Sequence, residues 1–174
     1  MAAYVAGDAA AFRALFERYA GPLHRMVLRR LGSEADARDV VQQTMLQMHR
    51  ARNDFRSGSR LRPWLFTIAM NLVRGYYRSA GRRREQSLDD RAPEPRAASA
   101  EQPEDARLSD EEHQRVRAAL GSLPEAQRVV IELHWWGECP YEEIAQIVGA
   151  SVAAVRVRAH RGYEQLRRIL AERE

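Results

Sequence analysis

The chain has 174 residues, enough for one ordinary domain or two small ones, and its hydrophobic content of 45% excludes a disordered chain. One cysteine, Cys139, excludes an internal disulfide and a cysteine-based zinc cluster, and no apolar run approaches the roughly 18 residues that span a bilayer. The net charge of +4 conceals an asymmetry, because residues 1–84 carry 16 arginines against 6 acids whereas residues 85–112 carry 3 against 10.

The basic first part of the chain has the electrostatic footprint of a protein that binds a polyanion. All 28 basic residues are arginines, which suit phosphates and guanine edges but also fit a simple genomic base bias. The sequence does not open on a charged segment followed by an apolar one, as a secretion leader would. We therefore expect a cytoplasmic protein with no membrane insertion, no cofactor and no metal site.

The first 84 residues have helical periodicity throughout. Asp8 is a plausible cap for a first helix, whose apolar stripe consists of Phe12, Leu15, Phe16 and Tyr19. Gly21-Pro22 predicts a break or kink, after which Leu23, Met26, Val27 and Leu31 continue on a second helix. Ser33 and Asp36 form a capping-box pattern that predicts a third helix over 34–51. Its polar side has little net charge, which suits a protein partner or an ordinary exposed face.

A loop rich in Arg, Ser and Gly follows at 52–61, and Pro63 suits the first turn of a fourth helix over 62–84. From residue 74 to residue 84 this helix carries five arginines with Tyr76 and Tyr77 among them. Arginines that track phosphates and rings that stack on bases are typical of single-strand binding, although a surface helix with two packed tyrosines fits equally well. Asn71 is placed to hydrogen-bond a base edge, and the alternative is a solvated side chain.

Residues 85–108 contain three prolines and many acids, which predicts a flexible linker. Ser109 and Glu112 form a second capping box, Gly121 ends that helix, and Pro124 begins another. The predicted fold is all-α, with two small helical domains, 1–84 and 109–174, joined by a flexible acidic linker.

Residues 141–170 predict a helix-turn-helix. Gly149 provides the turn, and Ser151 caps the second helix. The apolar stripe of that helix consists of Val152, Val155, Ala159, Gly162, Leu166 and Ile169. Arginines lie off this stripe, where they either form a solvated face or contact the major groove of duplex DNA. Because the turn, the cap and the stripe occur together at the required spacing, we favour DNA contact.

Three segments resemble the extracytoplasmic-function sigma factors, the smallest members of the bacterial sigma-70 family. DARDVVQQTMLQMHRARNDF (36–55) is similar to the core-polymerase-binding part of sigma region two, and RLRPWLFTIAMNLVRGYYR (60–78) to the part that melts promoters and reads the −10 element. The stretch from LPEAQR to the end of the helix-turn-helix (123–170) is similar to sigma region four. The segments occur in the family's order and cover nearly the whole chain outside the linker.

This resemblance implies a sigma factor that binds core RNA polymerase, promoter DNA and an anti-sigma factor, and that has no catalytic residues of its own. The implied core-binding residues are Asp39, Val40, Gln42, Gln43 and Leu46. The implied −10 residues are Arg56, Arg60, Asn71, Arg74, Tyr77 and Arg78. The implied −35 residues are Ser151, Arg156, Val157, Arg158, His160 and Arg161.

The chain departs from the family pattern at a few positions. Ala153-Ala154 replaces the usual Gly-Thr before the recognition helix valine, which removes one hydroxyl from the −35 surface. Arg38 stands where an acid is common, and Gly75 where the family often has Asp. Two other classes remain as alternatives: a stand-alone DNA-binding regulator, and a sigma-like decoy that binds a protein partner only. An enzyme is disfavoured because no nucleophile–base pair or paired carboxylates occur at a recognisable spacing.

Overall fold

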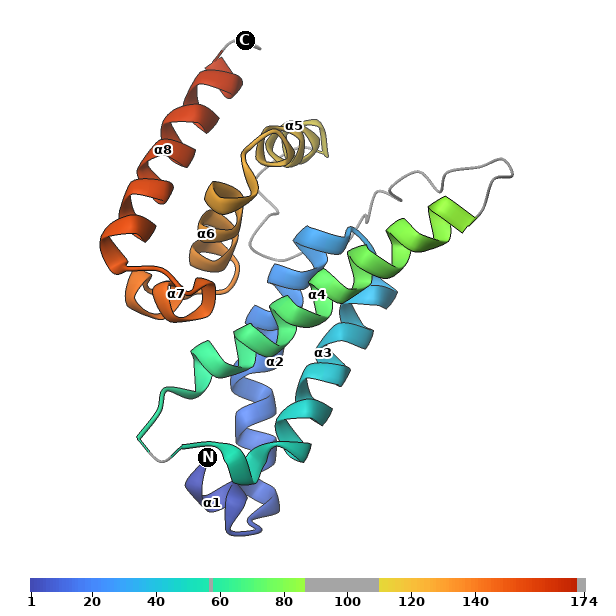
Figure 1. Ribbon diagram of the computed structural model, residues 1–174, viewed down its shortest axis with the longest axis vertical. Coiled ribbons are helices and arrows are strands. Elements are labelled where there is room, and N and C mark those ends of the chain that lie inside the picture. The colour runs from blue at the N-terminus through green and yellow to red at the C-terminus, as the bar shows by residue number, and fades with distance from the viewer. Residues whose placement is uncertain (57, 87–109, 172–174) are drawn as a thin grey trace. The chain divides into compact units, whose positions relative to one another are not determined.

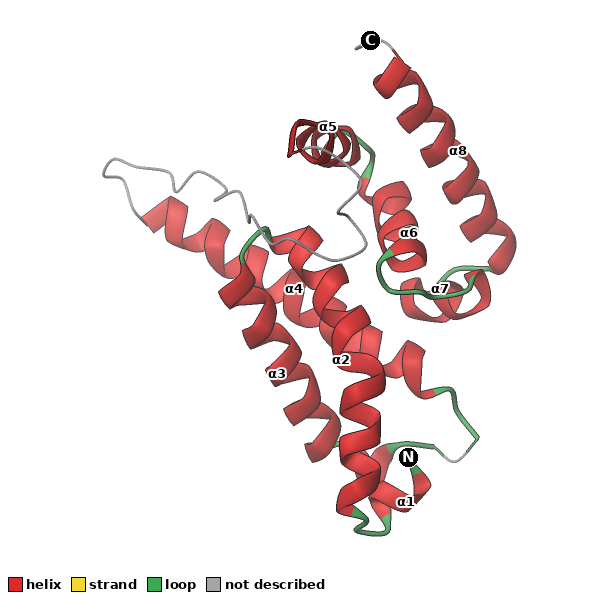
Figure 2. Cartoon of the chain, turned by 180° about the vertical axis from the view of Figure 1, so that it is seen from behind, coloured by secondary structure: helices red, strands yellow, loops and turns green. Residues whose placement is uncertain are grey.

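The structure is a computed structural model that describes residues 1–56, 58–86 and 110–171 (Figures 1 and 2). The regular elements in these ranges are all helices, and they form two compact units. The predicted all-α fold with two helical domains is thereby confirmed. Of the predicted linker, residues 85 and 86 are the last of a helix, and residues 87–108 lie outside the described residues.

The first unit is built around three long helices that pack against one another (Figure 1). Its elements are α1 (Ala2–Val5), α2 (Ala9–Leu31), α3 (Glu34–Arg50), the 3-10 helix η1 (Arg52–Asp54) and α4 (Leu61–Gln86). The core lies between α2, α3 and α4. Its largest fully buried side chains are Leu23, Met26, Met48, Leu65, Phe66 and Met70.

Side-chain caps fix where α2 and α3 begin. The carboxylate of Asp8 accepts from the amides of Ala10 and Ala11, and the hydroxyl oxygen of Ser33 accepts from the amide of Asp36. Gly32, at a left-handed φ of 69°, ends α2 and allows the tight turn into α3. Both caps were predicted from the sequence and are confirmed.

The predicted break at Gly21-Pro22 does not occur, because α2 is one helix with Pro22 inside it. An internal proline costs about 3 kcal/mol or more in lost hydrogen bonding and steric conflict. Tyr19 before the proline and Leu23 and Met26 after it are all buried in the same core. Burial on both sides of Pro22 offsets that cost.

The described residues of the second unit form four helices, of which the last contacts the other three (Figure 2). They are α5 (Asp110–Gly121), α6 (Glu125–Trp135), α7 (Tyr141–Val148) and α8 (Val152–Ala171). Leu120, Leu123 and Ile131 form a buried cluster between these helices. Gly121 and Pro124 lie at the helix ends where they were expected, whereas Ser109 and the side chain of Glu112 lie outside the described residues.

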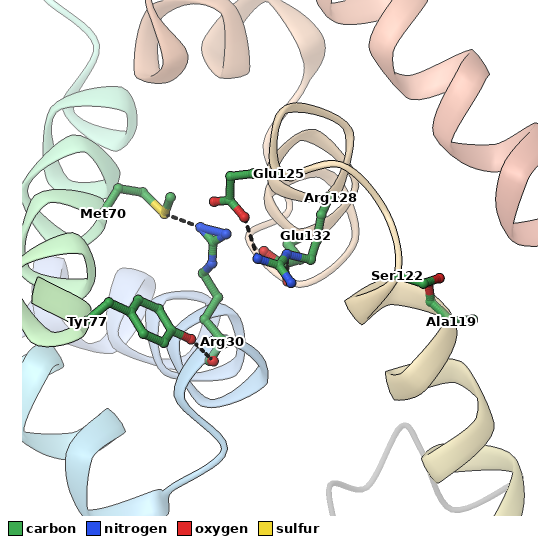
Figure 3. A network of polar contacts seen from close by, with 8 residues as sticks. All are labelled: Arg30, Met70, Tyr77, Ala119, Ser122, Glu125, Arg128 and Glu132. Carbon is green, nitrogen blue, oxygen red and sulfur yellow. Dashed lines mark hydrogen bonds and ion pairs between the residues drawn. The ribbon is translucent and has the colours of Figure 1, made fainter. Parts of the chain in front are cut away.

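On α6, Arg128 forms ion pairs with Glu125 and with Glu132, the latter at 4.0 Å (Figure 3). Glu132 is buried, so this arginine provides the opposite charge that a buried carboxylate requires. Among the described residues, no helix is long and apolar enough to cross a bilayer.

Candidate nucleic-acid interface

The helix-turn-helix is formed by α7, a three-residue turn and α8. Gly149 adopts a left-handed conformation (φ 65°, ψ 43°) that ends α7. The hydroxyl oxygen of Ser151 accepts from the amide of Ala154 at 3.1 Å, which caps α8. Both residues therefore have the local roles that the sequence predicted. The Ser151 hydroxyl still has its own hydrogen to donate toward a phosphate.

Opposite sides of α8 differ sharply in exposure. Val155, Ala159 and Gly162 are buried, as the predicted stripe requires. The exposed side carries most of the predicted −35 residues, namely Ser151, Arg156, Val157, His160 and Arg161. Arg158 is only half-buried and lies at the edge of this surface. An exposed valine (48%) among arginines suits a major groove, where apolar contacts to thymine methyl groups add to hydrogen bonds.

Two carboxylates lie next to basic side chains of this surface. Arg156 is 3.6 Å from Glu142 of α7, and His160 is 3.4 Å from Glu164 one turn along α8. Both pairs are solvent-exposed, so each contributes little to stability. The guanidinium of Arg156 can therefore exchange its carboxylate partner for a base edge or a phosphate at small cost.

An aromatic group lies beside the helix-turn-helix and was missed from the sequence. Trp135 is 65% exposed, and its indole N–H donates to the hydroxyl oxygen of Tyr163 at 2.8 Å. Burial raises the pKa of the Tyr163 phenol, so this hydroxyl stays neutral and ties the end of α6 to α8. The hydrophobic periodicity of the sequence did not predict this exposed tryptophan, because its exposure depends on tertiary packing.

The predicted −10 residues of α4 lie on an exposed side of that helix. Asn71, Arg74 and Arg78 are exposed and follow one another at steps of three and four. The side-chain oxygen of Asn71 accepts from the guanidinium of Arg74 at 3.0 Å. Because Asn71 accepts this bond through its oxygen, it keeps its amide hydrogens as donors.

The two tyrosines of α4 have different environments. The hydroxyl of Tyr76 donates to the carboxylate of Asp36 at 2.8 Å, which fastens α4 to α3. The hydroxyl of Tyr77 donates to the backbone carbonyl of Arg30, whose guanidinium donates to the sulfur of Met70 at 3.6 Å (Figure 3). Tyr77 nevertheless exposes 51% of its surface. Of the pair, Tyr77 offers a ring for base stacking, and Tyr76 holds helices together.

The loop before α4 carries two exposed arginines, Arg56 and Arg60. Its backbone turns at Gly58, which has a left-handed φ of 82°. The half-buried rings of Phe55 and Trp64 lie 5.1 Å apart and join the loop to the first turn of α4. Aromatic packing therefore anchors a loop whose charged side chains extend into solvent.

The predicted core-binding residues of α3 are exposed with one exception. Asp39, Gln42, Gln43 and Leu46 all face solvent. Val40 is 8% exposed and packs in the domain core, so it offers little surface to a partner. Its backbone carbonyl also accepts the hydroxyl of buried Thr44 at 2.7 Å.

An apolar cavity of about 1100 Å³ lies beside this surface, lined by residues of α1, α2 and α3. Phe12, Phe16, Met45 and Leu46 are among its lining residues, and Phe16 is 44% exposed. Phe16 belongs to the apolar stripe predicted for this helix, and it lines the cavity together with Phe12, whereas Tyr19 of the same stripe is buried. Among the described residues, no group of three or more His, Cys, Asp and Glu side chains is placed to hold a metal ion.

Taken together, the geometry defines a helical protein with a helix-turn-helix in one unit and a basic helix with an exposed aromatic ring in the other. Two family descriptions match this chain: Sigma-70 region 2 over residues 15–83, and Sigma-70, region 4 over residues 113–166. The RNA polymerase sigma factor CarQ of Myxococcus xanthus is 36% identical over 164 residues, which cover 94% of this chain and 91% of that protein. The ECF RNA polymerase sigma-E factor of Escherichia coli strain K12 is 35% identical over 166 residues, covering 92% and 86%.

Solved structures agree with these relatives. CnrH, solved in complex with the cytosolic domain of CnrY, is 29% identical with a TM-score of 0.74, covering 99% of this chain and 96% of that one. The sigma factor RpoE of Bartonella quintana, solved with the anti-sigma factor NepR, is 25% identical with a TM-score of 0.75, covering 92% and 97%. The chain belongs to the extracytoplasmic-function sigma factors of the sigma-70 family. Its function is that of a sigma factor in transcription initiation.

Proposed function

We propose that the two units divide the work of a sigma factor between named surfaces. The first unit binds core RNA polymerase through α3 and holds the unpaired −10 strand along α4 and the loop before it. The second unit reads the duplex −35 element through α8. One observation carries the proposal most directly: α8 buries Val155 and Ala159 while it exposes Arg156, Val157 and Arg161.

The −35 surface would combine two kinds of contact. Arg156 and Arg161 have the planar, two-pronged donor geometry that suits guanine, with Val157 and His160 between them. Ser151 and Arg158, at the edge of this surface, would touch phosphates and fix the register of α8 in the groove. Each well-placed base contact contributes about 1–3 kcal/mol of discrimination.

The −10 surface would take single-stranded DNA. Arg56 and Arg60, in the loop before α4, and the amide of Asn71 would capture a base flipped out of the stack. Flipping costs a few kcal/mol, and stacking on Tyr77 would offset about 1–3 kcal/mol of it. Arg74 and Arg78 would hold the adjacent phosphates.

Core polymerase would dock on Asp39, Gln42, Gln43 and Leu46. A mixed polar surface with one exposed leucine resembles the rim and anchor of a protein interface more than a DNA-binding face. Catalysis belongs to the polymerase, so the chain needs no active site or cofactor of its own. The site of action is the cytoplasm, where the polymerase works.

An anti-sigma factor is the second protein partner that we propose. Both solved relatives have a protein bound, in one of them a named anti-sigma factor. The acidic segment 85–108 would pass through the positively charged interior of the polymerase, where its net negative charge favours it.

Single substitutions test the division between the units. Arg156→Ala or Arg161→Ala should cost about 1–3 kcal/mol of binding free energy at the −35 element. Each should therefore lower −35-dependent transcription and leave core binding intact. Leu46→Asp should do the opposite, weakening core binding while leaving the −35 surface unchanged. Core binding is measured by anisotropy with labelled sigma, and promoter use by run-off transcription on templates with intact and scrambled −35 elements.

An arginine of the same unit outside α8 provides the matched control. Arg115→Ala on α5 removes the same charge and should keep −35 dependence. Equal loss of core binding in the Arg156, Arg161 and Leu46 variants would contradict the assignment of separate surfaces.

A further inference from the structure

Gly75 lies in the interior of α4, at a position where neither packing nor backbone conformation requires a glycine. A Cβ built on Gly75 would meet no atom within 4 Å, so packing does not require its absence. The residue is not among the glycines with positive φ, so its backbone does not require glycine either. Glycine is, after proline, the least favourable residue inside a helix. The position therefore carries a cost to folding that none of the described residues explains.

The neighbours of Gly75 on its side of α4 are the predicted DNA contacts. Asn71 precedes it by four residues and Arg78 follows it by three, which places all three on one side of the helix. Arg74 lies next to it in sequence, and these three side chains are exposed. Gly75, which is itself half-buried, is thus a gap beside polar and basic side chains, where a Cβ would meet no other atom.

We propose that Gly75 is itself a contact residue for the unpaired promoter strand. Because Gly75 has no side chain, the sugar–phosphate backbone lies directly against the main chain of α4 between Arg74 and Arg78. Glycine is the residue that permits such a close approach of the protein backbone to a ligand. This inference rests on the proposed role of α4 and adds a steric requirement to its charges.

The test compares Gly75→Ala with Gly121→Ala in the full-length protein. Gly121 is also helical, and a Cβ there would meet nothing within 4 Å, but it lies in the other unit. Gly75→Ala should raise the Tm of its unit by about 4–8 °C, because alanine is the better helix former in a helix interior.

DNA binding then separates the two variants. The probe is a promoter found by run-off transcription, with its −10 region held unpaired by mismatches, and the ligand is the reconstituted holoenzyme. Gly75→Ala should bind this bubble about tenfold more weakly, the loss typical of one removed contact, and Gly75→Val more weakly still. Gly121→Ala should bind it as the parent does, and core binding should be equal in all variants.

A Gly75→Ala protein that gains stability and binds the bubble as tightly as the parent would overturn the inference. A loss of stability in that variant would overturn it too, since the open space around Gly75 is its premise. Arg78→Ala separates this failure from that of the proposed function. If Arg78→Ala weakens bubble binding and Gly75→Ala does not, only the role of Gly75 fails. If neither does, the role of α4 in DNA binding fails with it.

Discussion

At the scale of single residues, Tyr77 combines two roles that separate substitutions can resolve. Its hydroxyl donates to the carbonyl of Arg30 in the last turn of α2, where carbonyl groups lack a partner within the helix. Its ring is half exposed beside Arg74 and Arg78. The hydroxyl should therefore affect folding, and the ring should affect binding of the single strand.

Tyr77→Phe keeps the ring and removes the hydrogen bond. It should lower the free energy of unfolding by about 0.5–1.5 kcal/mol and leave bubble binding close to that of the parent. Tyr77→Ala should weaken bubble binding by about 1–3 kcal/mol, the contribution of one base stack. Thermal unfolding and holoenzyme titrations of bubble DNA measure the two effects. Equal loss of DNA binding in both variants would show that the hydroxyl, and not the ring, is the contact.

Residue roles that depend on near neighbours were predictable from the sequence, and roles set by distant contacts were not. Ser33 and Ser151 were identified as caps because a cap bonds an amide two or three residues away. Tyr76 resembled Tyr77 until the structure placed Asp36 of α3 within reach of its hydroxyl. Val40 was expected to contact a partner, and only the packing of α3 against its neighbours showed that its side chain is buried.

At the scale of elements, the contact between α6 and α8 depends on Gly162. A Cβ there would lie 2.7 Å from the Cδ1 of Ile131, which is itself buried at 2% exposure. Gly162→Ala should therefore destabilise the second unit by about 1–3 kcal/mol through overpacking, despite the better helix propensity of alanine.

A double-mutant cycle identifies the cause of that loss. Ile131→Val removes the Cδ1 atom and should itself cost about 0.5–1.5 kcal/mol. The double variant should lose less than the sum of the two single variants, because the valine makes room for the new methyl group. Urea unfolding of the four proteins gives the coupling. If the two losses in the free energy of unfolding simply add, the contact with Ile131 is not the cause of the loss in Gly162→Ala.

Elements that depend on local signals could be predicted from the sequence, and elements that depend on distant contacts could not. The helix-turn-helix was predicted because its turn, cap and stripe are all local signals. Pro22 indicated a helix boundary, but burial of Tyr19 and Leu23 in one core overrides it. The short α1 was not predicted, because Tyr4 is held there by the ring of Phe12, 5.4 Å away, and by a hydrogen bond with His49 of α3.

At the scale of the whole molecule, the charge distribution agrees with the division of labour. The first unit carries most of the excess arginine, as binding to the phosphates of unpaired DNA requires. The second unit has almost balanced charge overall but concentrates arginines on one side of α8. This arrangement predicts a strong salt dependence for promoter binding by the holoenzyme, since each neutralised phosphate releases counterions.

The most direct test of the central claim is run-off transcription from a promoter library with core polymerase, in the presence and absence of this protein. We expect transcripts only when the protein is present, and their start sites should share a two-element motif at the −35 and −10 positions. Silence with core binding intact would contradict the claim in favour of a decoy. Silence without core binding would leave only a stand-alone DNA-binding protein.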